Sequence, residues 1–194
     1  MGLVGINGSY YFDSYNNPIV LINNTNSTDP TYSQLLDFLQ HEYTDTYYYN
    51  LAYANQSPGS YYGSAQSKVD IKGVQAAINN LVPYPSVPRI CSDFAERLHN
   101  SSEMAGFRCG YVIIELQGTA SGHALNVFNT TDKGLIYIDD TGATTTRPTN
   151  RDKTVNIQIG KPYSPESLFP GEGFFWQSLG IVASVNIVWD GNWN

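Results

Sequence analysis

The second half of the chain consists largely of short apolar runs separated by turn residues. Three of them follow closely, at 111–116 (YVIIEL), 123–128 (HALNVF) and 134–139 (GLIYID), and two more lie at 154–159 and 180–189. Runs of this length, rich in β-branched and aromatic residues, predict strands. Because the loops between the first three are short, neighbouring strands are expected to pair antiparallel. This half of the chain therefore predicts an antiparallel sheet.

Helical periodicity precedes the sheet. A first helix is expected to start at Asp29 and Pro30, with Asp29 as its N-cap and Pro30 in the first helical position. Its apolar stripe consists of four residues on one side: Leu35, Leu36, Phe38 and Leu39. Further helices are predicted at 69–82 and 91–106, the last ending at Gly106.

The remaining segments predict strands and loops. Short strands with turns are expected within residues 1–30, and loops within 44–66, which is rich in Tyr, Gly and Ser, and within 160–175. Helices that precede an antiparallel sheet indicate the α+β fold class. Neither an internal repeat nor a break in composition divides the chain, so residues 1–194 are predicted to form a single domain.

The amino-acid composition argues against some classes of binding partner. Of the 194 residues, 41% are hydrophobic, which is enough for a core, and 14% are charged, with a net charge of −7. Such a chain lacks the basic surface that nucleic acid requires, and an anionic membrane surface does not attract it. No apolar stretch approaches the ~20 residues of a membrane span. The first residues also lack the basic region and the long apolar run of a signal peptide.

Several Asn-x-Ser/Thr triplets fit a protein outside the cell. They begin at Asn7, Asn23, Asn26, Asn100 and Asn129. Such triplets are the acceptors of N-linked glycans. Together with the low charge and the abundant tyrosine, they favour an extracellular or cell-surface location.

Cys91 and Cys109, the two cysteines of the chain, are the first candidates for chemistry. In a secreted protein a disulfide between them would be the ordinary expectation. Helix 91–106 would, however, separate its ends by roughly 20 Å at 1.5 Å per residue, whereas a disulfide needs Cα atoms within about 7 Å. We therefore expect free thiols.

Cys91 occupies a position where a helix favours a thiolate. The first turn of a helix carries partial positive charge and unpaired N–H groups, and both lower the pKa of a thiol. A histidine is still needed to accept the proton. His99 lies two turns further along the same helix and is expected to face solvent, as is His41. His123 begins a strand, from which its ring can project, and is the predicted partner of Cys91.

The hairpin of the second and third strands suggests the acid that orients His123. If residues 129–133 form a five-residue loop, His123 faces Asp139, and directly opposite residues share one face with Cβ atoms about 5 Å apart. A carboxylate there would fix the imidazole tautomer and stabilise the imidazolium. A slip of one residue would present Asp140 instead. We prefer Asp139, so the predicted catalytic residues are Cys91, His123 and Asp139.

Other kinds of site have weaker support. A zinc site would have to use a scattered set of residues: Cys91, His99, Cys109 and His123. That set lacks the closely spaced ligand pairs that zinc sites use. The sequence contains no phosphate-binding, dinucleotide, serine-hydrolase or zinc-protease motif. No metal and no cofactor are predicted.

The stretches PRICSDFAERLH, GHALNVF and GLIYIDDTG resemble the three motifs of the transglutaminase-like superfamily of cysteine enzymes. In that family the Cys begins the central helix, the His begins a strand, and the Asp ends the next strand in an Asp-x-Thr context. Cys91, His123 and Asp139 match these positions. The resemblance covers about residues 91–142. It implies a papain-like fold, with helices packed on an antiparallel sheet and a Cys-His-Asp triad.

The segment before Cys91 departs from the papain-type pattern. Papain-type peptidases place an oxyanion-hole Gln a few residues before the Cys, where this chain has Pro85. The donors expected here are the Cys91 backbone N–H and one side chain, for which Trp176, Gln177 and the Tyr-rich loop are candidates.

Three functions fit these residues. The first is hydrolysis of a peptide, isopeptide or other amide bond, in which the Cys91 thiolate attacks the carbonyl and water resolves the thioester. The second is transfer of the acyl group to an amine, as in transglutaminases, with the same first half-reaction. The third is a non-catalytic surface binding module of the same fold. We favour hydrolysis, with a peptide or protein as substrate.

Overall fold

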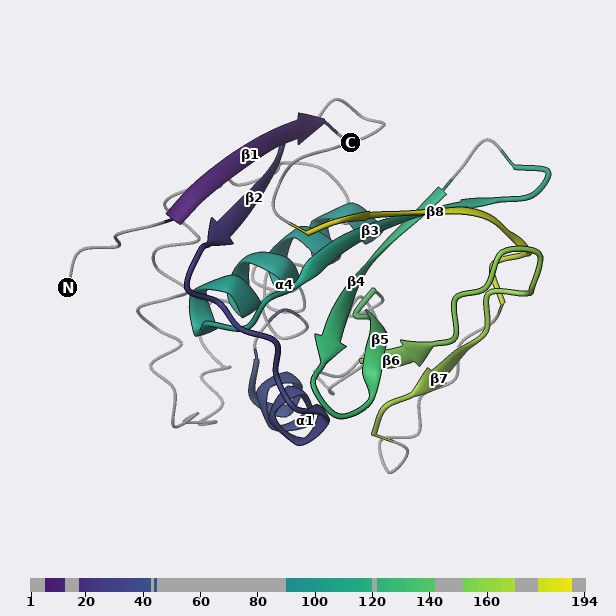
Figure 1. Cartoon of the computed structure of the whole chain (residues 1–194). Coiled ribbons are helices and arrows are strands. Elements are labelled where there is room, and N and C mark those ends of the chain that lie inside the picture. Colours follow the sequence, from purple (N-terminus) through teal and green to yellow (C-terminus); the bar gives the residue numbers. More distant parts are fainter. Residues whose placement is uncertain are drawn as a thin grey trace, which may run out of the picture.

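The computed structural model describes seven parts of the chain: residues 6–12, 18–42, 44, 90–119, 122–141, 152–169 and 178–189. Its helices there are α1 (Tyr32–His41) and α4 (Cys91–Ala105). A two-stranded sheet pairs β1 (Ile6–Phe12) with β2 (Pro18–Asn24). The strands of a six-stranded antiparallel sheet are β3 (Gly110–Leu116), β4 (Gly122–Thr130), β5 (Gly134–Asp139), β6 (Lys153–Val155), β7 (Pro165–Ser167) and β8 (Val182–Val188). The predicted α+β class is confirmed, with helices packed on an antiparallel sheet (Figure 1).

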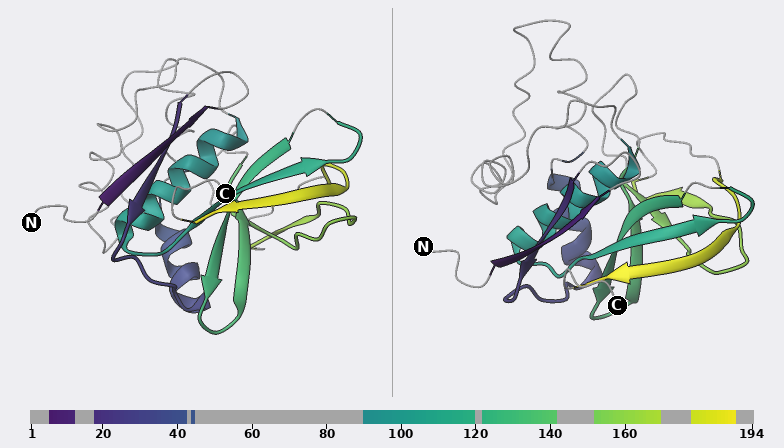
Figure 2. Two further views of the ribbon diagram at one scale, coloured as in Figure 1. Left: turned by 45° about the horizontal axis from the view of Figure 1, so that its top comes forward. Right: turned by 90° about the horizontal axis from the view of Figure 1, so that it is seen from above.

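The six-stranded sheet, in the order β7-β6-β5-β4-β3-β8, curves strongly (Figure 2). The segment before β7 meets the start of β8 and the residues just before it. Tyr163 N–H donates to the Gly180 carbonyl at 2.7 Å, and Val182 N–H donates to the Lys161 carbonyl at 2.9 Å. The curved sheet encloses one apolar cluster: Val112, Ile114, Leu116, Leu125, Val127, Val155, Tyr163 and Val182. Tyr163 is thus a core residue of the sheet as well as a bridge between its ends.

Helix α4 lies between the six-stranded sheet and the β1–β2 hairpin (Figures 1 and 2). On the sheet side Ala95 packs against Tyr111, Ala124 and Val188. Helix α1 joins the same side, where a further cluster contains Leu35, Leu39, Leu98, Cys109, Phe128 and Ile138. The start of α4 is therefore fixed against β3 and β4.

One edge of β2 pairs with β1, and the polar side of α4 covers the other edge. Glu96, Asn100 and Glu103 accept hydrogen bonds from the N–H groups of alternate β2 residues. The donors are Val20 at 3.0 Å, Ile22 at 2.8 Å and Asn24 at 3.1 Å. One helical turn and two strand residues advance by similar distances, roughly 5–7 Å. An i, i+4, i+7 spacing on the helix can therefore serve every second residue of the strand.

His99 and Asn100 correct two expectations about this helix. The expectation that His99 faces solvent is wrong: it is 1% exposed, and its Nε2 lies 3.0 Å from the Ile22 carbonyl oxygen. Asn100, which begins one of the glycosylation triplets, is fully buried and donates to the Val20 carbonyl at 2.7 Å. Both corrections have one cause, because the hairpin covers a helix face that periodicity alone assigned to solvent.

The bounds of other elements also differ from the expectations. Thr31, not Asp29, caps α1, since its Oγ1 accepts the Gln34 N–H at 3.2 Å while Gln34 Oε1 accepts the Thr31 N–H at 2.8 Å. The strand predicted at 154–159 ends at Val155, and the loop predicted at 160–175 contains β7. Gly106 ends α4 in a left-handed conformation (φ 87°), as predicted.

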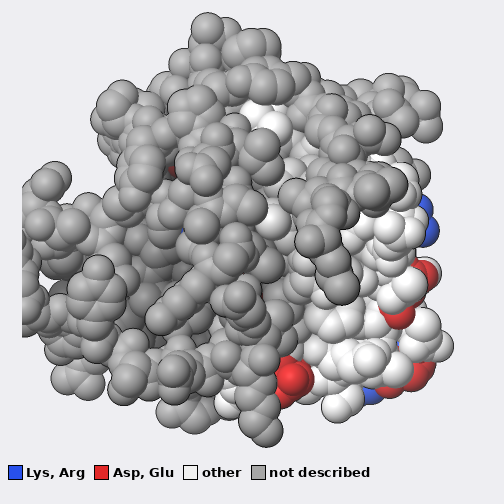
Figure 3. All heavy atoms as spheres, turned by 90° about the vertical axis from the view of Figure 1, so that its left-hand side faces the viewer, with Lys and Arg blue, Asp and Glu red and all other residues white. Residues whose placement is uncertain are grey.

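Some predicted segments cannot be compared with the structure, whereas the expectations about membrane spans and surface charge can. The helix predicted at 69–82 and nearly all of the loop at 44–66 lie outside the described residues. Neither helix of the described ranges is long and apolar enough to cross a membrane. Where Figure 3 shows described residues, the surface is mostly uncharged, in keeping with the 14% of charged residues.

Replacing Asn100 tests the contact between α4 and β2. In Asn100→Ala the buried Ile22 N–H and Val20 carbonyl both lose their side-chain partner, so the free energy of unfolding should fall by ~2–4 kcal/mol. Urea denaturation measures this change. The matched control is Asn129→Ala, which removes an exposed amide. If both substitutions lower the free energy of unfolding equally, the buried hydrogen bonds of Asn100 do not stabilise the contact between α4 and β2.

Candidate active site

Cys91 is the first residue of α4. The preceding Ile90 is extended (φ −118°, ψ 170°), so the helix begins abruptly at the cysteine. The Asp93 carboxylate accepts the Ile90 N–H at 3.0 Å and closes the first turn. Cys91 is partly buried and its thiol is free, as is that of the fully buried Cys109 beyond the other end of the helix. The two thiols therefore lie at opposite ends of α4.

His123 is placed by the close pairing of β3 and β4. Gly122 precedes it, and a Cβ at that position would lie 2.6 Å from the Ile114 carbonyl oxygen, well inside van der Waals contact. The absence of a side chain at Gly122 lets the two strands pair at this point, where Ile114 faces His123 in the register. The imidazole is 7% exposed.

The predicted contact between His123 and Asp139 is present, but the predicted hairpin register is wrong. Nε2 of His123 lies 3.0 Å from Oδ2 of Asp139. Thr130 pairs with Gly134, so residues 131–133 form the loop in place of 129–133. The Thr130 hydroxyl donates to the Gly134 carbonyl at 2.8 Å, which extends the strands further than expected. A shift by two residues keeps the same face, so the two side chains meet diagonally.

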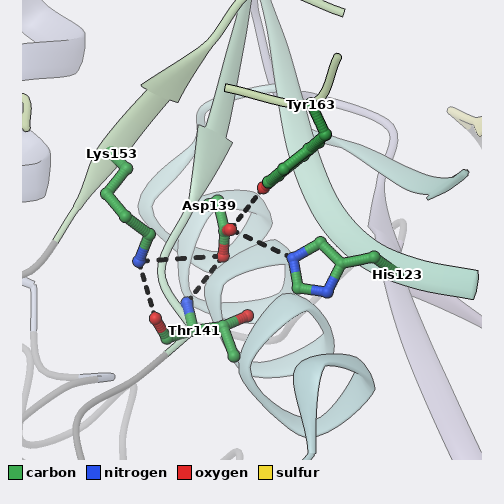
Figure 4. Close-up of polar contacts among 5 residues, drawn as sticks. All are labelled: His123, Asp139, Thr141, Lys153 and Tyr163. Carbon is green, nitrogen blue, oxygen red and sulfur yellow. Dashed lines mark hydrogen bonds and ion pairs between the residues drawn. The ribbon is translucent and has the colours of Figure 1, made fainter. Parts of the chain in front are cut away.

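Three further residues hold the Asp139 carboxylate, which is fully buried (Figure 4). The Thr141 N–H donates to Oδ1 at 2.8 Å, and Lys153 Nζ lies 3.9 Å from the same oxygen. The Tyr163 hydroxyl donates to Oδ2, the oxygen that also contacts His123. Both carboxylate oxygens are thereby occupied.

Lys153 and Tyr163 were not predicted as site residues. Lys153 lies directly opposite Asp139 in the β5–β6 register and is fully buried. The sequence did contain a signal for Lys153, because this lysine lies beside the apolar run at 154–159. If that strand is buried, the lysine side chain needs an anionic partner. Tyr163 lies in the segment assigned to a loop, and nothing in the sequence marks it.

Electrostatics favour an ion pair between Cys91 and His123. Burial by itself would raise the pKa of the Cys91 thiol, but the hydrogen bond and charge of His123, with the Ala124 backbone, lower it below its usual value. Burial opposes a charged His123, yet Asp139 and Cys91 outweigh it and raise the pKa of the imidazole to about 9. Because Nε2 faces Asp139, Nδ1 is the nitrogen available to the thiol.

The Asp139 carboxylate remains ionised in this environment. Burial would raise its pKa, but the charge of Lys153 and the contacts with His123 and Tyr163 hold it well below its usual range. Burial and the neighbouring Asp139 raise the pKa of Tyr163, which therefore remains a hydrogen-bond donor. An ionised Asp139 can both fix the His123 tautomer and stabilise its charged form.

The alternative acid, Asp140, belongs to a different cluster. One carboxylate oxygen of Asp140, one of Glu42 and one of Asp152 lie within 4.8 Å of one another. Acidic groups often gather in this way without a cation, so we assign no metal to them. The scattered zinc set considered above is not among the groups that come together in the described ranges.

The expected side-chain donors of the oxyanion hole cannot be placed, because Trp176, Gln177 and nearly all of the Tyr-rich loop lie outside the described residues, as does Pro85. His41 is exposed, as predicted, and its Nδ1 lies 2.7 Å from the Asp37 carbonyl oxygen. Burial raises the pKa of the Cys109 thiol well above its usual value, which leaves this thiol unreactive.

Comparison with family models, curated proteins and solved structures finds no match to this chain. The candidate active site is therefore defined by its own geometry: a thiol at the start of a helix, an imidazole that contacts it, and a buried carboxylate behind the imidazole.

Proposed function

We propose that the protein is a thiol-dependent hydrolase of amide bonds in peptides or proteins. One observation carries this proposal: His123 contacts Asp139 through Nε2 at 3.0 Å and at the same time lowers the pKa of the Cys91 thiol. A nucleophile, a base and an orienting acid in this order are what covalent acyl chemistry requires.

Each group has a defined task in the proposed reaction. His123 Nδ1 takes the proton of Cys91, and the thiolate attacks the substrate carbonyl carbon to form a tetrahedral oxyanion. The imidazolium then protonates the leaving amine as the C–N bond breaks, which gives a thioester on Cys91. Water, deprotonated by His123, attacks the thioester, and release of the acid restores the thiol.

The start of α4 supports the oxyanion step. The Cys91 backbone N–H belongs to the first turn, whose N–H groups have no acceptor within the helix. Such a donor, together with the helix dipole, stabilises charge that develops next to the nucleophile. We assign the first oxyanion donor to this N–H.

The fold and the location complete the proposal. The order of Cys, His and Asp on a helix, a strand and the end of the next strand supports a place in the transglutaminase-like superfamily, with its papain-like fold. The remaining glycosylation triplets and the low charge support an extracellular or cell-surface location.

Alkylation of Cys91 by iodoacetamide tests the ion pair. The rate should already be high near pH 6, because the thiolate forms below the ordinary thiol pKa of ~8.5. His123→Ala should reduce the rate at that pH by about tenfold or more, as measured by mass spectrometry of the labelled peptide. His41→Ala, which removes an exposed histidine, is the control. An ordinary thiol profile in the wild-type protein would exclude the nucleophile proposed here.

The pH dependence of turnover tests the role of Asp139. The rate should rise as Cys91 ionises and fall as His123 loses its proton near pH 9. Asp139 raises the pKa values of both groups, so both limbs should move to lower pH in Asp139→Asn, with a rate loss of at least about 100-fold. Asp132→Asn, an exposed acid, is the control. If Asp140→Asn moves the limbs instead, Asp140 is the orienting acid.

Product analysis identifies the acyl acceptor. A tryptic digest of denatured casein, with and without biotinylated cadaverine, is incubated with the protein and analysed by mass spectrometry. A hydrolase should produce new peptide termini or deamidated glutamine, and neither should appear with Cys91→Ala. Biotin on glutamine, in place of these products, would assign the protein to acyl transfer. No change to any peptide would favour a binding module.

A further inference from the structure

Lys153 is a buried cation directly beside the candidate active site. It lies opposite Asp139 in the register of β5 and β6, and both side chains are fully buried. Its Nζ donates to the Thr141 carbonyl at 2.6 Å and lies 3.9 Å from Asp139 Oδ1 (Figure 4). A buried ion pair of this kind contributes little net stability compared with apolar residues of similar size. Its position therefore needs another explanation.

The charges around Asp139 provide that explanation. A thiolate on Cys91, an imidazolium on His123 and a carboxylate on Asp139 together carry one excess negative charge. In a buried site this excess opposes formation of the thiolate. The positive charge of Lys153 removes it, so the orienting acid can be ionised without preventing ionisation of the nucleophile.

Hydrogen bonds divide the two oxygens of Asp139 between separate tasks. Oδ1 accepts the Thr141 N–H and faces Lys153, while Oδ2 accepts the Tyr163 hydroxyl and contacts His123. The Tyr163 ring also packs edge-on against the imidazole, with centroids 5.3 Å apart and planes at 73°. The carboxylate cannot rotate without losing several of these contacts, which keeps Oδ2 directed at His123.

We propose that Lys153 is a positioning residue that holds Asp139 and neutralises its charge, so that the Cys91 thiolate forms at low pH although Asp139 is ionised. This inference rests on the proposed function. Tyr163 supports the same carboxylate from the opposite side. The contacts of Lys153 with Asp139 and with the Thr141 carbonyl place its action on Asp139.

Other charged groups near this network belong to identified elements. Cys91 comes from α4, His123 from β4 and Tyr163 from the segment before β7. Asp140 and Asp152 adjoin Asp139 and Lys153 in sequence and form the acidic cluster with Glu42. Apart from His123, these residues are neutral or acidic, so none of them can replace the positive charge of Lys153.

Three substitutions separate the charge of Lys153 from its space-filling role. Lys153→Gln keeps a donor for the Thr141 carbonyl and removes the charge, Lys153→Met removes both, and Lys153→Arg keeps the charge. Lys161→Met is the matched control, because it removes an exposed lysine. Cys91 ionisation is followed by the pH dependence of iodoacetamide alkylation, and His123 ionisation by NMR titration of its ring.

Loss of the cation should raise the pKa values of both Cys91 and His123, because it leaves the negative charge of Asp139 uncompensated. That charge disfavours the thiolate and favours the imidazolium. Lys153→Gln and Lys153→Met should therefore move both titrations to higher pH by about one unit. Lys153→Arg and Lys161→Met should leave them at the wild-type positions. This direction is opposite to that expected for Asp139→Asn. A general loss of structure would not raise both pKa values together.

The outcomes distinguish this inference from the proposed function. An ordinary thiol profile in the wild-type protein would contradict the proposed function itself. A low-pH profile that Lys153→Gln and Lys153→Met leave unmoved would overturn the role of Lys153 alone. If neither variant folds, as judged by circular dichroism, Lys153 serves stability and the inference is wrong.

Discussion

The rest of the structure depends on the enclosure of α4 on two sides. The backbone edge of β2 is buried against the helix, and buried N–H groups must have partners. Glu96, Asn100 and Glu103 are those partners. On the opposite side, the Asn126 side chain donates to the Ala95 carbonyl at 2.9 Å and ties the helix to β4. With both sides fixed, the first turn of α4 has one position relative to the strand that carries His123.

Position alone does not create the proposed ion pair, because burial opposes charge on both Cys91 and His123. His123 opposes this effect at Cys91, and the Asp139 carboxylate opposes it at His123. Asp139 is itself buried and held ionised by Lys153, His123 and Tyr163. Each charge in the network is thus stabilised by the next, from Cys91 on α4 to Lys153 on β6. A substitution of Lys153 should therefore change the ionisation of Cys91, as expected of a coupled set of titrating groups.

The parts of the structure that sequence could predict are those governed by local pattern. The α4 helix with Gly106 at its end and the strands β3 to β5 follow from periodicity and turn residues. The contact of His123 with Asp139 was predicted from an incorrect register, and it was correct because an even shift preserves the face of the sheet. Periodicity identifies a face but not what covers it. For that reason the burial of His99 and the contact of Tyr163 with Asp139 could not be foreseen.

His99 and His123 offer a comparison within one molecule. Both rings are buried, at 1% and 7% exposure, and burial opposes their charged forms. The ring of His99 meets carbonyl oxygens, which do not compensate for burial, and its pKa falls to about 4. The ring of His123 meets a carboxylate and a thiol, and its pKa rises to about 9. The same side chain at similar depth is therefore neutral in one place and charged in the other near pH 7. Since burial acts in the same direction on both, the difference must come from the anionic partners, and Asp139 is the partner that remains ionised whether or not Cys91 carries a charge.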